Sequence, residues 1–90
     1  MIVEIYEENN LGIIIKIISK KILEFCNDSN LSVNQFASIC NLPQSTMQYL
    51  VDEKSKNPKI MTIIKVCNGM NITLKEFFDD PLFNNMEIVD

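Results

Sequence analysis

The stretch from Leu31 to Leu50 constrains the fold most, because it contains two short helical patterns separated by a tight turn. Ser32 stands where a helix N-cap belongs, and Gln35 follows three residues later, as a capping box requires. The apolar residues of the first helix then recur at helical spacing, at Val33, Phe36, Ala37 and Cys40. Two short amphipathic helices joined this closely predict an all-α fold.

The turn and the second helix follow directly. Asn41 is, after glycine, the residue that best tolerates the left-handed conformation that ends a helix. Pro43 is expected at the first helical position, so that the second helix covers residues 43–51. Small Ala37 lets the two helices cross closely, and four apolar residues are expected to fix the crossing angle: Ile39, Leu42, Met47 and Leu50. This arrangement is a helix-turn-helix, whose second helix can enter the major groove of DNA.

The residues before this motif divide into two segments. Residues 1–12 mix β-forming and acidic residues and predict a short extended N-terminal arm. Residues 13–27 predict a helix whose inner face carries Ile14, Ile18, Ile22 and Phe25. The remaining isoleucines, Ile13, Ile15 and Ile17, lie off that stripe and predict a surplus of apolar surface. We expect either the arm or a second copy of the chain to cover it.

The residues after the motif predict two more helices. A polar loop over residues 52–58 precedes a helical pattern through Ile60, Ile63, Ile64 and Cys67. Thr73 and Glu76 form a second capping box for a last helix, with Leu74, Phe77 and Phe78 facing the core. The expected organisation is therefore an arm (1–12), one five-helix domain (13–80) and a C-terminal tail (81–90).

The residue types present argue against catalysis. The chain has no histidine, and its three cysteines are far apart in sequence, so the usual metal-ligand patterns and the commonest general base are missing. We expect all three cysteines, Cys26, Cys40 and Cys67, to be core residues. The sequence thus predicts no enzyme, no cofactor and no metal. The apolar run that begins at Leu11 is interrupted by lysines and is too short to span a bilayer. A cytoplasmic protein without a membrane partner is the expectation.

Charge is distributed unevenly along the chain. The net charge is −4, but residues 30–66 carry four lysines against two acidic residues, a net of +2. Because distant charges are screened, this central basic segment can still approach phosphates. The absence of arginine weakens the case for reading guanine.

The sequence from Leu31 to Phe78 resembles the lambda-repressor-like (Xre-type) helix-turn-helix family. The resemblance rests on L-S-V-N-Q-F-A-S-I-C-N-L-P-Q-S-T-M-Q-Y-L, a polar loop with N-P, and I-M-T-I-I-K-V-C-N-G-M-N-I-T-L-K-E-F-F. It implies a five-helix lambda-repressor-like DNA-binding domain. Asn41 and Glu53 depart from the family pattern, because each stands where the family usually has glycine.

The resemblance also locates the expected contacts with DNA. The residues expected to read base edges are Gln44, Ser45, Gln48 and Tyr49. Gln44 is the strongest of them, since a glutamine amide can bond both N6 and N7 of adenine. The residues expected to contact the DNA backbone are Ser32, Asn34, Thr46, Lys54, Lys56, Asn57 and Lys59.

Two functions remain open from the sequence. The first is a homodimeric, sequence-specific regulator of transcription, most simply a repressor, bound to double-stranded DNA. The second is a protein-interaction module, such as an antitoxin, a phage antagonist or a regulatory subunit, whose helix-turn-helix scaffold binds a partner protein. The acidic ends and the surplus apolar surface favour the second. Replacing Gln44 by alanine separates them, because only the first depends on base reading.

Overall fold

The computed structural model of the chain describes residues 2–55, 57–81 and 83, and the side chains among them from residue 12 onward. This part of the chain forms helices and contains no strand. The five helices are α1 (Ile2–Asp28), α2 (Val33–Ile39), α3 (Gln44–Val51), α4 (Ile60–Met70) and α5 (Leu74–Phe78). The predicted all-α, five-helix fold is confirmed.

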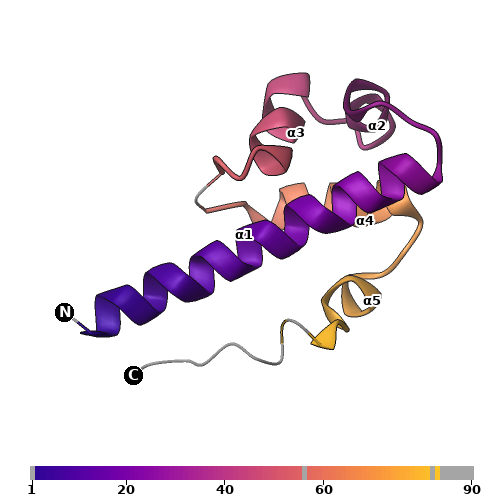
Figure 1. Ribbon diagram of the computed structural model, residues 1–90. Coiled ribbons are helices and arrows are strands. Elements are labelled where there is room, and N and C mark those ends of the chain that lie inside the picture. Colours follow the sequence, from indigo (N-terminus) through magenta and orange to yellow (C-terminus); the bar gives the residue numbers. More distant parts are fainter. Residues whose placement is uncertain (1, 56, 82, 84–90) are drawn as a thin grey trace.

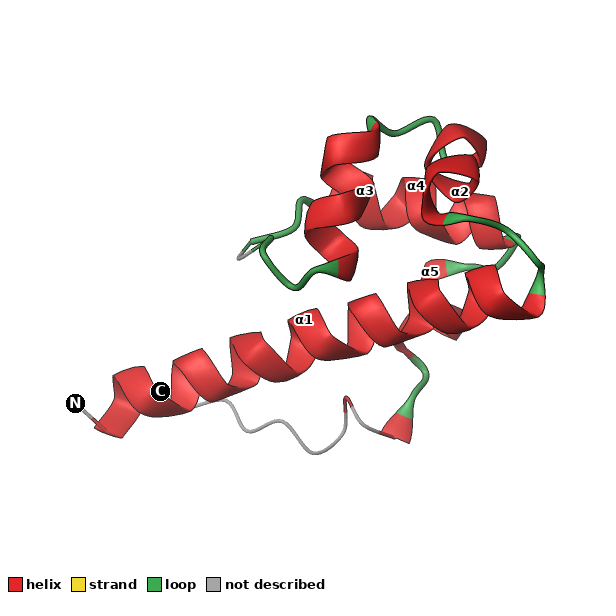
Figure 2. Ribbon diagram, turned by 45° about the horizontal axis from the view of Figure 1, so that its top comes forward, coloured by secondary structure: helices red, strands yellow, loops and turns green. Residues whose placement is uncertain are grey.

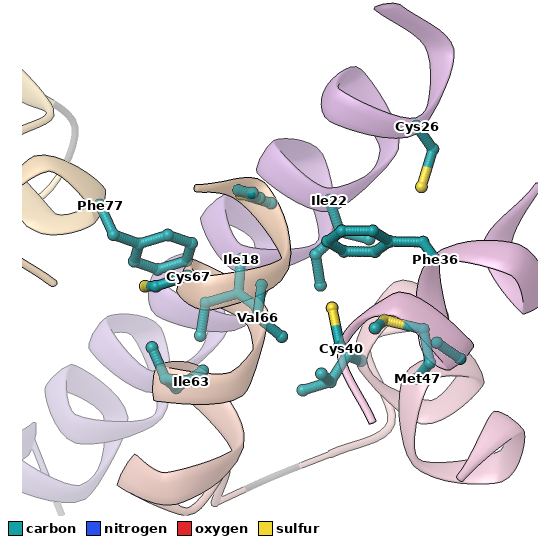
Figure 3. Packing of buried hydrophobic residues seen from close by; sticks show 13 residues of the cluster. Ile18, Ile22, Cys26, Phe36, Cys40, Met47, Ile63, Val66, Cys67 and Phe77 are labelled. Carbon is teal, nitrogen blue, oxygen red and sulfur yellow. The ribbon is translucent and has the colours of Figure 1, made fainter. Parts of the chain in front are cut away.

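The helices surround one core. Long α1 crosses the molecule, with α2 and α3 on one side of it and α5 on the other (Figure 1). Side chains from all five helices meet in the middle (Figure 3), and the six largest that are fully buried are Phe36, Phe77, Ile22, Met47, Val66 and Cys67. Phe25 of α1 packs against Phe36 of α2, with ring centroids 5.1 Å apart. The predicted inner face of α1 is confirmed, because Ile18 and Ile22 are buried while Ile14 and Phe25 pack against the core.

The extended conformation expected for the N-terminal residues is wrong. Helix α1 begins at Ile2, well before residue 13, and runs without interruption to Asp28. No proline lies in this stretch to stop the helix from growing toward the N-terminus. Glu4, Glu7 and Glu8 fall near the start of α1, where negative charge favours the helix dipole.

The expected apolar surplus on α1 is smaller than predicted. Of the three isoleucines outside the predicted stripe, Ile15 and Ile17 are buried and Ile13 is 38% exposed, while Leu23 on the same helix is 46% exposed. Helix α1 is covered on two sides, because α5 also reaches it: Lys21 Nζ lies 3.0 Å from Asp80 Oδ2 and 5.5 Å from the centre of the Phe77 ring. Of the expected tail, residues 82 and 84–90 lie outside the described residues.

Local hydrogen bonds start the short helices as predicted. At α2, the Gln35 amide donates to Ser32 Oγ (3.1 Å) and the Ser32 amide donates to Gln35 Oε1 (2.8 Å). Thr73 and Glu76 form the same reciprocal pair at α5. One boundary is wrong by a residue: Pro43 is the N-cap of α3, and the helix itself begins at Gln44.

Four of the helices end in the same way, with a residue in the left-handed conformation. Asn30, Asn41 and Asn71 adopt φ values of 57°, 57° and 60°, which confirms the prediction for Asn41. After each asparagine comes an apolar residue whose amide bonds back to the helix, for example Leu42 to the Ala37 carbonyl at 2.9 Å. At the end of α3, Glu53 adopts φ 61° and Lys54 bonds to the Tyr49 carbonyl at 2.9 Å. Glu53 therefore occupies a position that glycine would fill without strain.

Helices α2 and α4 approach each other closely at Gly69. A β-carbon at this position would collide with Cys40 Sγ and lie 3.2 Å from Phe36 Cε1. Gly69 lies one residue before the end of α4, and the left-handed residue that ends this helix is Asn71. The glycine is therefore needed for the close packing of the two helices and not for the turn.

Three residues expected in the core lie largely at the surface: Ile39 (53% exposed), Ile60 (58%) and Phe78 (41%). Each is the first or the last residue of its helix, where the neighbouring helix no longer covers its side chain.

Candidate nucleic-acid interface

The two helices of the predicted motif, α2 and α3, lie side by side on the same side of α1 (Figure 2). Met47 and Leu50 of α3 are buried and anchor the helix against the core. Because those anchors lie on one face, the opposite face of α3 is left in solvent. The sequence thus positions α3 as a helix with one solvent-exposed face, held by two inward side chains.

All the residues expected to read bases lie on that exposed face. Gln44, Ser45 and Gln48 are exposed, and Tyr49 is 56% exposed. They occupy the first two turns of α3, which is the part of a recognition helix that reaches base edges. The arrangement can present two amides, one hydroxyl and one phenol to the edges of successive base pairs.

Gln48 has a partner within the protein. Its Nε2 donates a hydrogen bond of 2.9 Å to Asp52 Oδ1, one turn further along the chain. The bond uses one of the two amide hydrogens, so Oε1 and the second hydrogen remain for a base. It also places a carboxylate beside the reading face, where it would repel phosphate.

The start of α3 adds backbone donors to this face. Pro43 caps the helix without a side-chain hydrogen bond, and the first turn contains no acidic residue. The first amides of an α-helix have no partner within the helix, and the helix dipole makes this end positive. Gln44 therefore lies at an end of α3 that favours acceptor atoms and negative charge.

Ser32, Asn34 and Thr46 were expected to contact the DNA backbone. Ser32 and Asn34 are exposed at the start of α2, and Thr46 is half-buried on α3. The Ser32 oxygen accepts the Gln35 amide, but its hydroxyl hydrogen is still available as a donor. Ser32 can thus cap α2 and bond a phosphate at the same time.

A depression of about 290 Å³ connects α3 to the loop before α4. It is lined by Thr46, Tyr49, Ser55, Asn57, Pro58, Lys59 and Thr62. The structure thereby brings together four residues that the sequence assigned to base or backbone contacts. Lys54 is exposed but does not line the depression, and Lys56 lies outside the described residues.

Ser55 and Thr62 are members of this depression that the sequence analysis missed. The Ser55 amide bonds to the Tyr49 carbonyl at 3.3 Å, which folds the loop back toward α3. Thr62 lies in the first turn of α4 and faces the same space. Their hydroxyl groups and the exposed Lys59 ammonium suit a phosphate oxygen. Only their position near a lysine-rich loop could have indicated them.

The cysteines belong to the core, as predicted. Cys26, Cys40 and Cys67 are all buried free thiols. Burial raises the pKa of each thiol, and for Cys40 burial together with the neighbouring Cys26 and Cys67 raises the pKa to about 11. Thiols in this state are poor nucleophiles. Within the described residues, no three cysteine or acidic side chains are grouped as a metal site requires.

Comparison with known proteins bears on this geometry. The sequence model of one family, described as a Cro/C1-type HTH DNA-binding domain, matches residues 21–81. The chain belongs to this family. The Cro/C1-type match spans all of α2, α3, α4 and α5 and the last part of α1, so the exposed face of α3 lies inside a known DNA-binding domain. No curated protein and no solved structure matches the chain.

Because it contains a Cro/C1-type domain, this protein is a DNA-binding regulator in general terms. The relationship to the Xre-like family that the sequence suggested is confirmed. It is a DNA-binding fold and not an enzymatic one. Among the described residues, none of the helices combines the length and the hydropathy needed to cross a membrane.

Proposed function

We propose that this protein is a homodimeric repressor that reads a specific double-stranded DNA sequence with α3. The observation that carries the proposal is the exposed face of α3 within a Cro/C1-type domain: polar side chains at its first turns, and two buried anchors behind them. A two-fold dimer would read two half-sites roughly 34 Å apart, or one turn of DNA. Occupying a promoter in this way blocks transcription without a second domain.

The proposal assigns a role to each of the exposed residues. Gln44 contacts adenine through its amide, and Ser45 and Gln48 add hydrogen bonds to neighbouring bases. Tyr49 offers its ring to a thymine methyl group or its hydroxyl to a phosphate. The backbone is held from two sides, by α2 through Ser32 and Asn34, and by the depression through Thr46, Asn57 and Lys59. Lys54 and Lys56 add positive charge along the same loop.

Selection from a pool of randomised double-stranded DNA at two salt concentrations tests the proposal. We expect an enriched palindrome whose affinity falls steeply as salt rises, because bound lysines release counterions from DNA. Gln44→Ala is expected to reduce the preference for the selected sequence by about 1–3 kcal/mol at one base pair of each half-site. Asn68→Ala, which removes an exposed amide from α4, serves as the matched control and should change nothing.

The same experiment separates this function from the protein-interaction alternative. If no sequence is enriched even at low salt, DNA reading is wrong, and the scaffold serves a partner protein. If a sequence is enriched but Gln44→Ala keeps the full preference, α3 is not the reading element. A reporter gene carrying the selected sequence in its promoter then tests repression, which should be lost with Gln44→Ala.

A further inference from the structure

A groove of about 300 Å³ lies where α1, α4 and α5 meet, and it adjoins the depression beside α3, because Asn57 and Pro58 line both. Its apolar lining comprises Ile14 and Ile18 from α1, Ile60 and Ile63 from α4, Phe78 from α5, and Pro58 from the loop before α4. Ile60 and Phe78 are among the most exposed large apolar side chains of the described residues. Apolar hollows with exposed rims of this kind mark surfaces that bind another apolar surface.

The N-terminal part of α1 extends beyond the other helices in both views of the molecule (Figures 1 and 2). A 27-residue helix is about 40 Å long, which corresponds to the longest dimension of the molecule, 41 Å. The family match begins at residue 21, so the extension lies outside the matched residues. A short helical stretch is marginal in water unless packing supports it.

The composition of this extension complements the groove. Residues 2–11 include five apolar residues: Ile2, Val3, Ile5, Tyr6 and Leu11. They also include Glu4, Glu7 and Glu8 and no lysine. Lys59 stands between the groove-lining residues Pro58 and Ile60 in sequence, but it lines the depression beside α3 and not the groove. The apolar composition of this helix therefore matches the apolar lining of the groove.

The position of the groove suggests how two copies would meet. Ile14 lines the groove only three residues after Leu11, so the groove lies at the base of the extension. A two-fold axis beside that point places the extension of each copy on the groove of the other. The groove and the extension of each chain are then buried in a single interface. We propose that the groove between α1, α4 and α5 receives residues 2–11 of α1 from a second copy of the chain. The proposal rests on the homodimer put forward above and assigns its interface.

Two single substitutions in the full chain test the two halves of the interface. Ile60→Lys places a charge in the groove, and Tyr6→Glu places one on the extension. Each is expected to weaken the dimer by at least about ten-fold, because an unpaired charge must be buried. The matched control is Ile39→Lys, which changes an equally exposed isoleucine on α2 and should leave the dimer intact. The measurement is sedimentation without DNA, with circular dichroism to show that each variant is folded.

Mixing the two weakened variants gives the decisive result. In a mixed dimer, one interface carries both substitutions, and the other pairs an unchanged groove with an unchanged extension. We therefore expect an equimolar mixture of Ile60→Lys and Tyr6→Glu to form more dimer than either variant alone. A purely structural defect in either variant would not be rescued in this way.

Several outcomes overturn the proposal. Folded Ile60→Lys and Tyr6→Glu proteins that dimerise like the unchanged chain would show that the interface lies elsewhere. Weakening by Ile60→Lys and Met86→Glu, but not by Tyr6→Glu, would assign the groove to the C-terminal residues. A chain that is monomeric at tens of micromolar would remove both the homodimer and this interface. Enrichment of a half-site sequence and its loss with Gln44→Ala depend on α3 and not on the dimer, so a failure of base reading is distinguished from a failure of the interface.

Discussion

The hydroxyl of Ser19 donates a hydrogen bond of 2.6 Å to the backbone carbonyl of Val51, which joins the middle of α1 to the last residue of α3. Ser19 is the buried polar residue of the described core, at 4% exposure. The last carbonyl groups of a helix have no partner within it, and Ser19 satisfies one of them. The bond therefore fixes the C-terminal end of α3, opposite the turns that carry Gln44 and Ser45.

Ser19→Ala is expected to lower the free energy of unfolding by about 1–2 kcal/mol, because it leaves a partly buried carbonyl without a donor. Chemical denaturation measures the change. Ser38→Ala removes an exposed hydroxyl that donates only a long, 3.4 Å bond to the Asn34 carbonyl, and should stay within about 0.5 kcal/mol of the unchanged protein. Equal losses in the two variants would contradict the structural role of Ser19.

The two glycines are expected to respond oppositely to alanine. Gly69→Ala should destabilise the protein by about 1–3 kcal/mol, since its β-carbon collides with Cys40 in a packed interior. Gly12→Ala should stabilise it by about 0.5–1 kcal/mol, because α1 gains helix propensity and nothing lies within 4 Å of the added carbon. Thermal unfolding of both variants provides the comparison, and a stabilised Gly69→Ala protein would refute the close approach of α2 and α4.

Glu53→Gly is expected to stabilise the protein by about 1 kcal/mol, because it removes a side chain from a left-handed backbone conformation. Glu53→Ala is the control, since it removes the same charge but keeps a β-carbon. The melting temperature should therefore rise clearly only for the glycine variant. A similar rise in both would assign the effect to charge.

Asp52→Asn is expected to increase affinity for DNA by about two- to five-fold at low salt, because it removes a negative charge beside the reading face. The asparagine keeps an oxygen that can accept the Gln48 amide, so the local geometry is retained. Titration of the selected DNA at rising salt measures the gain, which should shrink with screening. Asp79→Asn is the control, because Asp79 is exposed at the end of α5, and it should not increase the affinity for DNA. If Asp52→Asn leaves the affinity unchanged, Asp52 lies away from the phosphates.

Stability is expected to fall as the pH rises from about 9 to about 11. Burial raises the pKa of Cys40 from 9.0 to about 11, so the folded thiol keeps its proton where the unfolded thiol has lost it. The unfolded chain then binds fewer protons, and the free energy of unfolding decreases with pH over this window. Denaturant unfolding at several pH values should show a shallower decrease for Cys40→Ala. Parallel decreases in the two proteins would contradict the raised pKa.

Much of the fold is local and could be predicted from the sequence. The capping boxes at Ser32 and Thr73 join residues three positions apart, and the turn at Asn41 depends on that residue's own backbone preference. Helical periodicity also identified the buried anchors Met47 and Leu50. Each of these features is determined within one or two turns of chain, so the residues alone contain the necessary information.

Other features depended on how the helices pack. Periodicity indicates which face of a helix turns inward, but the extent of a neighbouring helix decides how much of that face is covered. Ile60 and Phe78 therefore fit the inward pattern and yet lie at the rim of a groove. The same reason explains why Ser55 and Thr62 were missed, since only the folding of the loop against α3 brings them to Tyr49.

The sequence by itself determined the helix-turn-helix, its caps and the polar composition of α3, because these depend on interactions between near neighbours. Only the tertiary structure decided that Ser19 holds the end of α3 and that an apolar groove stays open between α1, α4 and α5. Contacts between residues tens of positions apart follow from helix lengths and crossing angles, which the packing of the whole core sets.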